Sequence, residues 1–468
     1  MSKVLHSVDE AIRLLEIKDG MTVSFHHHLR NGDYVLNTVM AAIANAGIKN
    51  IKVNASSLFD VHEPLLDHIR NGVVTDIETA YMGAKIGSAI SHGILQNPVT
   101  FRTHGSRGAV IANGTSPVDV AFIAAPTSDE MGNCTGKTGK SACGSLGYAF
   151  ADAQYAKHVV IITDNLIKEP LENPSITGER VDYVVEMESI GNPAGIVSGT
   201  TRITRDPVGL VMASYAARII EASGLLKDGM SFQTGAGGAS LAAAKYLKDI
   251  MLEKKIKGSF GLGGITGYLV DMQKEGCFEE LRDVQCFDLN AVESIRTNPN
   301  HKEISAIEYA SPFNAEAAVN KLDVVILGAT EVDTDFNVNV HTDSNGSIMG
   351  GSGGHSDTAA GAKLAMIIAP LLRARLSIVS DKVSCISTPG NTVDVLVTQQ
   401  GIAVNPKRED LKQRLLDARL PVVDIHELKD RAQKIAGVPA PLVTGDRTVA
   451  NVVYRDGTII DTIKNLVK

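Results

Sequence analysis

The sequence has no tryptophan, and aromatic residues supply only 4% of its 468 positions. Its longest apolar runs, such as Val159–Ile162 and Leu364–Leu372, are shorter than the roughly 20 residues that a membrane-spanning helix needs. Positive charge is also in deficit, since 45 lysines and arginines face 53 aspartates and glutamates, for a net charge of −8. Nucleic-acid-binding proteins normally have a basic patch or stripe. We therefore expect neither a membrane partner nor a nucleic-acid partner.

Cysteine is scarce as well. The five cysteines are an odd-numbered set, and their spacing matches no common zinc motif. Free thiols in a reducing compartment are the simplest interpretation. The first residues, MSKVLHSVDEAIRLL, lack the apolar segment of a secretion signal. Together these features predict a cytoplasmic protein, and we expect no metal site.

Glycine, by contrast, is abundant, with 43 residues, and 44% of the chain is hydrophobic. At about 150 residues per domain, the length predicts two or three domains, each with a sizeable core. The many glycines predict tight loops and close approaches of the backbone.

An internal repeat divides the chain into two similar parts. The stretch KDGMT at Lys18–Thr22 returns as KDGMS at Lys227–Ser231, in each case between a helical pattern and a short apolar segment. Three more pairs follow in the same order at nearly the same offset: Pro117–Ala124 with Lys321–Gly328, Lys157–Ile162 with Arg375–Ser380, and Val181–Glu186 with Val393–Thr398. We infer a duplicated domain and divide the chain into residues 1–215 and 216–468.

Short, fully apolar segments alternate with longer helical patterns. Such segments are typical of strands buried on both faces, as in parallel sheets. We expect strands at Asp119–Ala124, Val159–Thr163, Val324–Gly328 and Leu376–Val379, and helices at Tyr34–Ala46, Val208–Leu225, Leu241–Glu253 and Thr358–Leu372. The alternation predicts an α/β fold of open, mostly parallel sheets. Ligands bind such sheets at loops beyond the carboxyl ends of the strands.

Three glycine-rich loops in the second part are therefore candidate sites. The first opens a helix, where free backbone N–H groups favour an anion, and it contains Gly235, Gly237 and Gly238. The second could form an oxyanion hole with Gly263 and Gly264. The third precedes an expected helix and contains Ser352, Gly353, Gly354, His355 and Asp357. His355 and Asp357 are a candidate proton carrier and its orienting carboxylate. The alternative for all three loops is a structural turn or helix cap.

Charged side chains elsewhere supply further candidates. The histidines at His26–His28 follow an expected strand and point in different directions, which favours anion binding over a metal site. Arg102 and Arg107 lie in a glycine-rich stretch and either grip a carboxylate or face solvent. Asp129 and Glu130 end another strand, where a structural turn is the favoured interpretation.

Taken in order, these segments resemble the CoA-transferases. The similar stretches are SPVDVAFIAAPTSDEMGN, QTGAGGASLA, GSFGLGGITG, GGSGGHSDTAAGA and STPGNTVDVLVTQQGIAVNP. From FHHHLRNGD onward the chain resembles citrate lyase alpha chains in particular, with TVSFHHHLRNGD and GKSACGSLGYAFADAQYAK among the closest stretches. The resemblance implies two CoA-transferase-type domains, of the NagB/RpiA-like kind, in one chain.

The resemblance also implies a reaction and its partners. An alpha chain of this kind exchanges acetate for citrate on an acyl carrier protein (ACP), so that citrate and acetyl-ACP give citryl-ACP and acetate. It works beside a beta chain, which cleaves citryl-ACP, and a gamma chain, which is the carrier, in an oligomeric complex. The CoA-like prosthetic group of the carrier supplies the thiol, so we expect no tightly bound cofactor in this chain.

One departure from the CoA-transferases affects the expected mechanism. Many of them use a glutamate nucleophile after their second glycine-rich loop, whereas here no glutamate precedes Asp271, and Glu275 lies further along an expected helix. We therefore expect a direct attack of the citrate carboxylate on the acetyl thioester. The alternatives are a free CoA-transferase acting on acetyl-CoA and another carboxylate, and a non-catalytic scaffold subunit.

The resemblance and the loops together assign roles to named residues. The expected catalytic residues are Gly263, Gly264 and His355. The expected citrate-binding residues are His27, Arg30, Arg102 and Arg107. The residues expected to bind the prosthetic group are Gly235, Gly237, Gly238, Ser352, Gly353 and Gly354.

Overall fold

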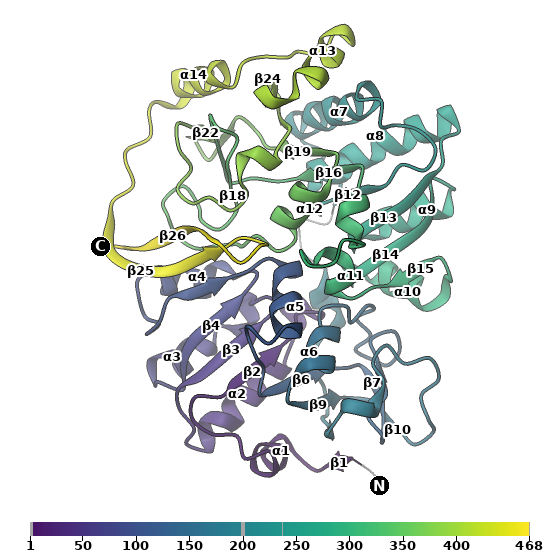
Figure 1. Ribbon diagram of the computed structural model, residues 1–468, viewed down its shortest axis with the longest axis vertical. Helices are drawn as coiled ribbons and strands as arrows, with labels where there is room; N and C mark the ends of the chain where they lie inside the picture. The colour runs from purple at the N-terminus through teal and green to yellow at the C-terminus, as the bar shows by residue number, and fades with distance from the viewer. Residues whose placement is uncertain (1–2, 198–201, 236, 468) are drawn as a thin grey trace.

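The computed structural model, which describes residues 3–197, 202–235 and 237–467, has two α/β halves. Figure 1 shows the first half at the bottom and the second half on top. Each half is built on a large, almost entirely parallel sheet, as the buried apolar segments predict. The predicted α/β fold class is confirmed.

The first sheet has ten strands, and every neighbouring pair is parallel except β25 and β26. In sheet order the strands are β1 (Val4–Leu5), β11 (Tyr183–Glu186), β9 (His158–Thr163), β6 (Val120–Ala124), β2 (Thr22–Phe25), β3 (Ile51–Ala55), β4 (Val74–Thr79), β5 (Val99–Phe101), β25 (Thr444–Val453) and β26 (Ile459–Leu466). The helices of this half are α1 (Val8–Leu14), α2 (Val35–Asn45), α3 (Leu65–Arg70), α4 (Ala84–Ser91), α5 (His104–Ala112) and α6 (Phe150–Tyr155).

The second sheet has eight strands, all parallel to their neighbours except β24. In sheet order they are β15 (His301–Glu303), β14 (Phe278–Cys286), β13 (Gly258–Ile265), β12 (Phe232–Thr234), β16 (Val324–Leu327), β19 (Leu364–Ile368), β23 (Val395–Thr398) and β24 (Gly401–Val404). The remaining helices are α7 (Pro207–Ala222), α8 (Gly238–Lys254), α9 (Gly267–Lys274), α10 (Leu289–Thr297), α11 (Ala306–Ala310), α12 (His355–Gly361), α13 (Glu409–Asp417) and α14 (Ile425–Ala436).

Short strands form three small sheets beside the large ones. They are β7 (Thr127–Asp129), β8 (Cys134–Thr135) and β10 (Leu166–Ile167), then β17 (Glu331–Asp333), β18 (Val338–Asn339) and β22 (Val379–Ser380), and finally β20 (Leu372–Arg373) and β21 (Leu376–Ser377).

The sequence repeat corresponds to a repeated topology. The order β11-β9-β6-β2-β3-β4-β5 of the first sheet recurs as β23-β19-β16-β12-β13-β14-β15 in the second. Equivalent aspartates also make equivalent bonds: Asp119 Oδ2 accepts a hydrogen bond from Thr22 N, and Asp323 Oδ2 accepts one from Ser231 N, both at 2.9 Å. The repeated Asp therefore ties the start of the central strand to its neighbour in each half.

The helix predicted at Thr358–Leu372 is wrong, because α12 ends at Gly361 and Leu364–Ile368 is the buried strand β19. A short apolar run fits a buried strand and a buried helix equally well, so periodicity alone does not separate them. The strand predicted at Leu376–Val379 is divided between the short strands β21 and β22. Since β19 occupies the place of β9 in the repeat, it is β19, and not Arg375–Ser380, that corresponds to Lys157–Ile162.

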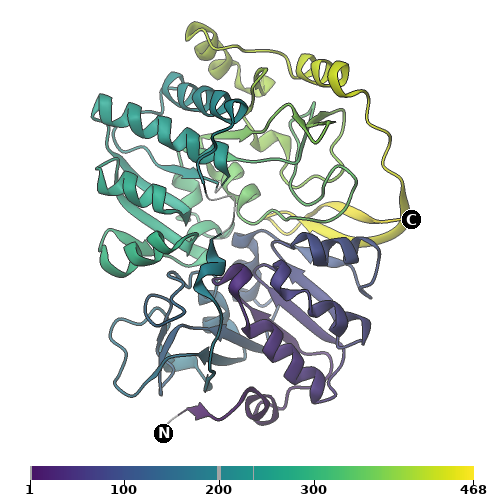
Figure 2. The ribbon, with the colours of Figure 1, turned by 180° about the vertical axis from the view of Figure 1, so that it is seen from behind.

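Two elements lie with the other half than a division at residue 215 would place them. Helix α7 packs against α8 and therefore belongs with the second half. The hairpin β25–β26 extends the first sheet, because β25 pairs in parallel with β5. Figure 2 shows the connection from α14 running down the outside of the molecule to this yellow hairpin. The chain thus returns to the first half after completing the second.

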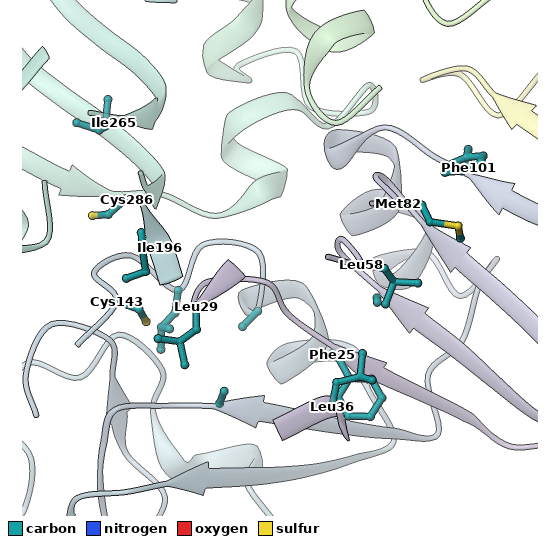
Figure 3. Packing of buried hydrophobic residues seen from close by; sticks show 14 of the residues in the cluster. Phe25, Leu29, Leu36, Leu58, Met82, Phe101, Cys143, Ile196, Ile265 and Cys286 are labelled. Carbon is teal, nitrogen blue, oxygen red and sulfur yellow. The ribbon is translucent and has the colours of Figure 1, made fainter. Parts of the chain in front are cut away.

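Buried apolar residues of both halves form one continuous cluster. Leu29, Cys143 and Ile196 of the first half and Ile265 and Cys286 of the second belong to it (Figure 3). The five cysteines are free, as predicted, and all of them are buried. Within the described ranges, no helix combines the length and the apolar character needed to cross a membrane.

Candidate functional site

A glycine-rich loop of the second half lies against the carboxyl edge of the first sheet. Gly353 N–H donates to the oxygen of Ala80 at 3.0 Å, and the Gly353 oxygen accepts from His104 N at 2.8 Å. Met82 N donates to the oxygen of Gly350 at 3.1 Å. Ala80 and Met82 follow β4, and His104 begins α5. The loop therefore lies at the edge where open α/β sheets bind ligands.

The histidines at His26–His28 follow β2 at the same edge, and each is at most 6% exposed. His27 Nδ1 lies 2.6 Å from Ser56 Oγ, and the His27 ring stacks on Tyr148 at 4.8 Å and on His104 at 5.5 Å. Burial lowers the pKa of His104 to about 3, so this ring is neutral at pH 7. His104 Nδ1 has no hydrogen-bond partner among the described residues. The site thus contains stacked, uncharged imidazoles.

Arg30 places a positive charge beside these rings. Its Cζ lies 5.3 Å from the ring centroid of Phe59 and 4.8 Å from that of Phe287. Its Nη1 is buried and has no hydrogen-bond partner in the part of the chain that the structure describes. Arg30 also has a φ of +52°, in the left-handed region that non-glycine residues rarely adopt. A strained, stacked arginine with a free N–H group is suited to bind a carboxylate.

Gly263 and Gly264 lie near the end of β13, next to the same aromatic residues. The register with β14 shifts between them, which marks a β-bulge. A Cβ atom at Gly264 would lie 2.1 Å from the Phe287 ring, and one at Gly263, whose φ is +102°, would lie 2.8 Å from the Gln233 side chain. Only glycine fits at these two positions. Their backbone therefore packs directly on the ring that stacks on Arg30.

Further contacts link these glycines to the loop at Gly353 and Gly354. Gln233 Nε2 donates to Tyr309 Oη at 3.0 Å, and this oxygen lies 2.5 Å from where a Cβ would stand at Gly354. A Cβ at Gly353 would lie 3.2 Å from His104 Nε2. We call the connected set the interface cluster: His27, Arg30, Phe59, His104, Tyr148, Gln233, Gly263, Gly264, Phe287, Tyr309, Gly353 and Gly354. Six predicted site residues belong to it, namely His27, Arg30, Gly263, Gly264, Gly353 and Gly354.

His355 begins α12 with both ring nitrogens engaged. Nε2 lies 2.9 Å from the oxygen of Gly328, and Nδ1 lies 2.8 Å from Thr388 Oγ1. Because a carbonyl only accepts, this arrangement places the ring proton on Nε2 and leaves Nδ1 to accept from the threonine hydroxyl. Burial lowers the pKa of His355 to about 4. The geometry therefore favours a framework role for His355 over the predicted catalytic one.

Ser352 and Asp357 hold the same loop in place. Ser352 Oγ lies 2.7 Å from Ser356 Oγ. Asp357 is fully buried, and its oxygens accept from Thr103 Oγ1 and Gly105 N, both at 2.9 Å. Thr103 is the N-cap of α5, so a carboxylate of the second half lies at the positive end of a helix dipole in the first. Burial raises the pKa of Asp357 to about 6 in spite of these donors.

The loop with Gly235, Gly237 and Gly238 lies at the start of α8. Gly235 N donates to the oxygen of Ile326 at 3.1 Å, so this amide is not free. Gly237 is the N-cap of α8 and supplies no side chain to bond the amides of the first turn. Gln233 of the interface cluster lies two residues before this loop. The loop Gly235–Gly238 is therefore adjacent in sequence to a member of the interface cluster.

The two other predicted citrate-binding arginines are held by carboxylates of the first half. Arg107 is 2% exposed, its two terminal nitrogens donate to Asp152 at 2.8 and 2.9 Å, and its Nε donates to Asn54 Oδ1 at 2.7 Å. Arg102 Nε donates to Glu78 at 2.7 Å. Arg107 therefore belongs to a framework ion pair and not, as predicted, to the citrate-binding residues, because its N–H donors are already bonded to Asp152 and Asn54.

The candidate acid Asp129 is also part of the framework. It accepts hydrogen bonds from the amides of Met131 and Asn133, two and four positions further on. Asp333 repeats this arrangement in the second half with the amides two and four positions after it. The same turn in both halves supports the structural interpretation of Asp129.

One group of buried side chains in the described ranges has the character of metal ligands: Asp283, Cys286 and His301. Asp283 Oδ2 lies 3.0 Å from both His301 Nε2 and Cys286 Sγ, and its Oδ1 accepts from Gln285 N at 2.7 Å. These groups satisfy one another by hydrogen bonding. They fix the end of β14, which contains Gln285 and is followed directly by Phe287.

The family model for the citrate lyase alpha subunit (CitF) matches residues 1–466. The chain belongs to this family. It is similar to the citrate lyase alpha chain of Klebsiella pneumoniae, with 48% identity over 464 residues that cover 99% of this chain and 91% of the relative. It is also 47% identical to the citrate lyase alpha chain of Escherichia coli (strain K12) over 461 residues, which cover 98% of this chain and 90% of that relative. The predicted transferase subunit of citrate lyase is confirmed.

Solved structures show the same fold. A crystal structure from Streptococcus mutans, described as the citrate lyase alpha subunit in complex with citrate, has a TM-score of 0.98 and 49% identity and covers 100% of this chain and 92% of its own. Two more distant structures share only the fold. A Pseudomonas malonate decarboxylase has a TM-score of 0.70 and 17% identity, with 93% of this chain and 87% of the decarboxylase chain covered. The 4-hydroxybutyrate CoA-transferase of Porphyromonas gingivalis has a TM-score of 0.59 and 18% identity, with 92% of this chain and 97% of the transferase chain covered. The CoA-transferase-like architecture expected of a citrate lyase alpha subunit is thus confirmed.

Sequence reasoning missed several members of the interface cluster. Tyr148 lies in the stretch GSLGYAF, whose resemblance to alpha chains was the one available signal. Gln233 likewise lies in the quoted stretch QTGAGGASLA. Phe59, Phe287 and Tyr309 lie in no motif, and distant parts of the chain bring them to the cluster.

Proposed function

We propose that this citrate lyase alpha subunit exchanges acetate for citrate on the thiol of an acyl carrier protein. In this reaction citrate and acetyl-ACP give citryl-ACP and acetate. The observation that supports the proposal most is the free, stacked Arg30 beside the glycine backbone of the interface cluster. A carboxylate bound at Arg30 would lie near backbone amides suited to stabilise an oxyanion. The citrate in the Streptococcus mutans relative is consistent with this acid.

The proposed chemistry takes two acyl transfers. A citrate carboxylate oxygen attacks the acetyl thioester carbon, and collapse of the tetrahedral oxyanion breaks the C–S bond. This step leaves a mixed acetic–citric anhydride and the carrier thiolate. The thiolate then attacks the citryl carbon, and the C–O bond breaks to release acetate. Neither step needs a proton, so the protein acts by positioning and by oxyanion stabilisation.

A route without a covalent glutamyl intermediate fits the carboxylates around the cluster. Glu275, the first glutamate after the Gly261–Gly267 loop, follows α9 and pairs with Lys248 at 2.9 Å, with its side chain 44% exposed. Asp357 and Asp283 are fully buried and accept framework hydrogen bonds with both oxygens. In the proposal the attacking carboxylate therefore belongs to citrate.

The proposed roles follow from position. Arg30 and His27 bind citrate, and the backbone of Gly263 and Gly264 stabilises the oxyanion. The CoA-like group of the carrier would pass along Gly235, Gly237, Gly238, Ser352, Gly353 and Gly354. The subunit itself holds no tightly bound cofactor. It works in an oligomeric complex with a gamma chain, which carries the thioester, and a beta chain, which cleaves citryl-ACP.

The test is acyl transfer by the purified chain alone, with acetyl-CoA as a mimic of the carrier and carbon-13-labelled citrate. We expect labelled citryl-CoA and free acetate, and no enzyme-bound thioester that borohydride reduces during turnover. Reduction of a glutamate in the protein would instead indicate a free CoA-transferase mechanism. Absence of transfer even with acetyl-ACP would indicate a scaffold subunit.

A further inference from the structure

The hairpin β25–β26 brings its turn to the edge of the first sheet where the interface cluster lies. Ala450 and Val452 of β25 pair in parallel with Val99 and Phe101 of β5. Because the two strands run in the same direction, the turn after β25 emerges beside the start of α5. Figure 1 shows the tip of the yellow hairpin pointing to the region between α5 and α12.

The turn, Tyr454–Thr458, is held by its own hydrogen bonds. Tyr454 N donates to the oxygen of Thr458 at 2.7 Å, and Asp456 Oδ1 accepts from Thr458 N at 2.9 Å and from its hydroxyl at 2.7 Å. Gly457 has a φ of +93°, which favours glycine. The backbone of Arg455 is therefore fixed within a defined turn.

Arg455 extends from this turn to the buried carboxylate of the second half. Its Nε lies 3.5 Å from Asp357 Oδ1, and its Nη2 donates to the oxygen of Ala310 at 3.4 Å. The Arg455 side chain is 14% exposed and that of Asp357 is fully buried. Arg455 acts electrostatically on Asp357, and the charge of Asp357 in turn contributes to raising the pKa of Tyr148, Tyr309 and Tyr454. Arg455 is the cation of this set.

We propose that Arg455 is a positioning residue for the acyl-exchange site and acts through Asp357. Asp357 accepts hydrogen bonds from Thr103 and Gly105 at the start of α5. His104 lies between these two residues, and its backbone N–H donates to the oxygen of Gly353 in the glycine-rich loop. The pair Arg455–Asp357 thereby holds α5 against the glycine-rich loop. The inference rests on the proposed function of the interface cluster and adds the hairpin to it.

This arrangement predicts a pH signature. Burial raises the pKa of Asp357 to about 6, while the Gly105 amide and the Arg455 charge act in the opposite direction. Without Arg455 the effect of burial is less opposed, so the pKa of Asp357 rises further. The ionised form, which accepts from both Thr103 and Gly105, then exists only at higher pH. The acidic limb of the activity profile should therefore move to higher pH.

The experiment compares Arg455→Met with Arg455→Lys and with Lys464→Met. Lys464 lies on the same hairpin, and its ammonium group donates within the hairpin to the oxygen of Asp446 and to Thr448 Oγ1, so its variant controls for general weakening of the hairpin. For Arg455→Met we expect kcat to fall on the order of tenfold or more with little change in KM, and the acidic limb to rise by about one pH unit. Arg455→Lys should recover part of both, and Lys464→Met should match the parent protein.

Hydrogen exchange supplies a readout that does not need activity. Peptides covering 101–107 and 350–358 should exchange faster in Arg455→Met than in Lys464→Met, because the Gly105 and Gly353 amides lose their support. In an Asp357→Asn background, Arg455→Met should have no further effect. Unchanged exchange together with an unchanged pH profile would overturn the inference. If the parent protein showed no acyl transfer, the proposed function would fail, and the exchange data would still decide the role of Arg455.

Discussion

Gln285 donates a hydrogen bond from Nε2 to the backbone oxygen of His27 at 2.8 Å, and this bond joins the end of a strand in the second half to the histidine segment of the first. Opposite the Gly263–Gly264 step of β13, the partners on β14 are Asp283 and Gln285, so Val284 is left unpaired. The bulge changes the direction of the following side chains.

We predict that Gln285→Leu lowers the free energy of unfolding by about 1–3 kcal/mol, because it leaves the buried His27 oxygen without its donor. Acyl transfer should fall as well, since His27 lies in the interface cluster. Denaturant titration and steady-state kinetics measure the two effects. Gln413→Leu is the matched control, because Gln413 bonds Asp417 on the exposed face of α13. Equal stability of the two variants would contradict this account.

Arg30→Met should raise KM for citrate on the order of tenfold to a hundredfold, from the loss of a charge-assisted contact of about 1.5–3 kcal/mol. Arg30→Lys should recover little of this, because an ammonium group does not reproduce the planar stack on Phe59 and Phe287. Arg296→Met, which removes an exposed partner of Glu293, is the control. An unchanged KM in Arg30→Met would exclude Arg30 from the citrate site.

Asp129→Asn and Asp333→Asn should each destabilise the protein by about 1–3 kcal/mol and leave kcat per folded molecule unchanged. Although burial opposes ionisation, hydrogen bonds from Leu171 and Asn133 hold the pKa of Asp129 below its usual value. Thermal denaturation and active-site-normalised kinetics separate the two effects. A large fall in kcat for Asp129→Asn alone would restore the catalytic interpretation of Asp129.

Buried neutral histidines should make the protein less stable in acid. Burial lowers the pKa of His341 to about 3, and the unfolded chain regains the ordinary value near 6.5. The stability from this group is therefore fully present above pH 6.5 and is lost as pH falls toward 3, at about 1.4 kcal/mol per pH unit. His341→Gln should flatten the dependence of unfolding free energy on pH between pH 6 and 4. Parallel curves for the two proteins would refute this.

Local sequence patterns predicted several of the elements that repeat. Apolar segments such as Val324–Leu327 lie in the middle of a sheet and are buried on both faces, so their composition reports their environment directly. The repeated Asp119 and Asp323 likewise make bonds to nearby strands of their own half. For these features the local sequence pattern and the position in the folded sheet favour the same structure.

Prediction failed where contacts between distant parts of the chain determine the role of a residue. Arg107 has the chemistry of a carboxylate receptor, but Asp152, 45 positions away along the chain, occupies it. The hairpin β25–β26 has no local feature that assigns it to the first sheet, and its Arg455 meets Asp357 only in the docked structure. Such pairings depend on packing between residues that are far apart in sequence, and the hydrophobic periodicity of a segment does not predict them.

The most direct test of the account is a single turnover with citrate labelled with oxygen-18 in its carboxylates, acetyl-ACP and an excess of the subunit. Direct attack by citrate predicts that the acetate released in this first turnover carries one oxygen-18 atom, and that peptides of the protein contain none. Unlabelled acetate together with oxygen-18 in a glutamate of the subunit would contradict the account, because that pattern requires the protein carboxylate to take the acyl group first.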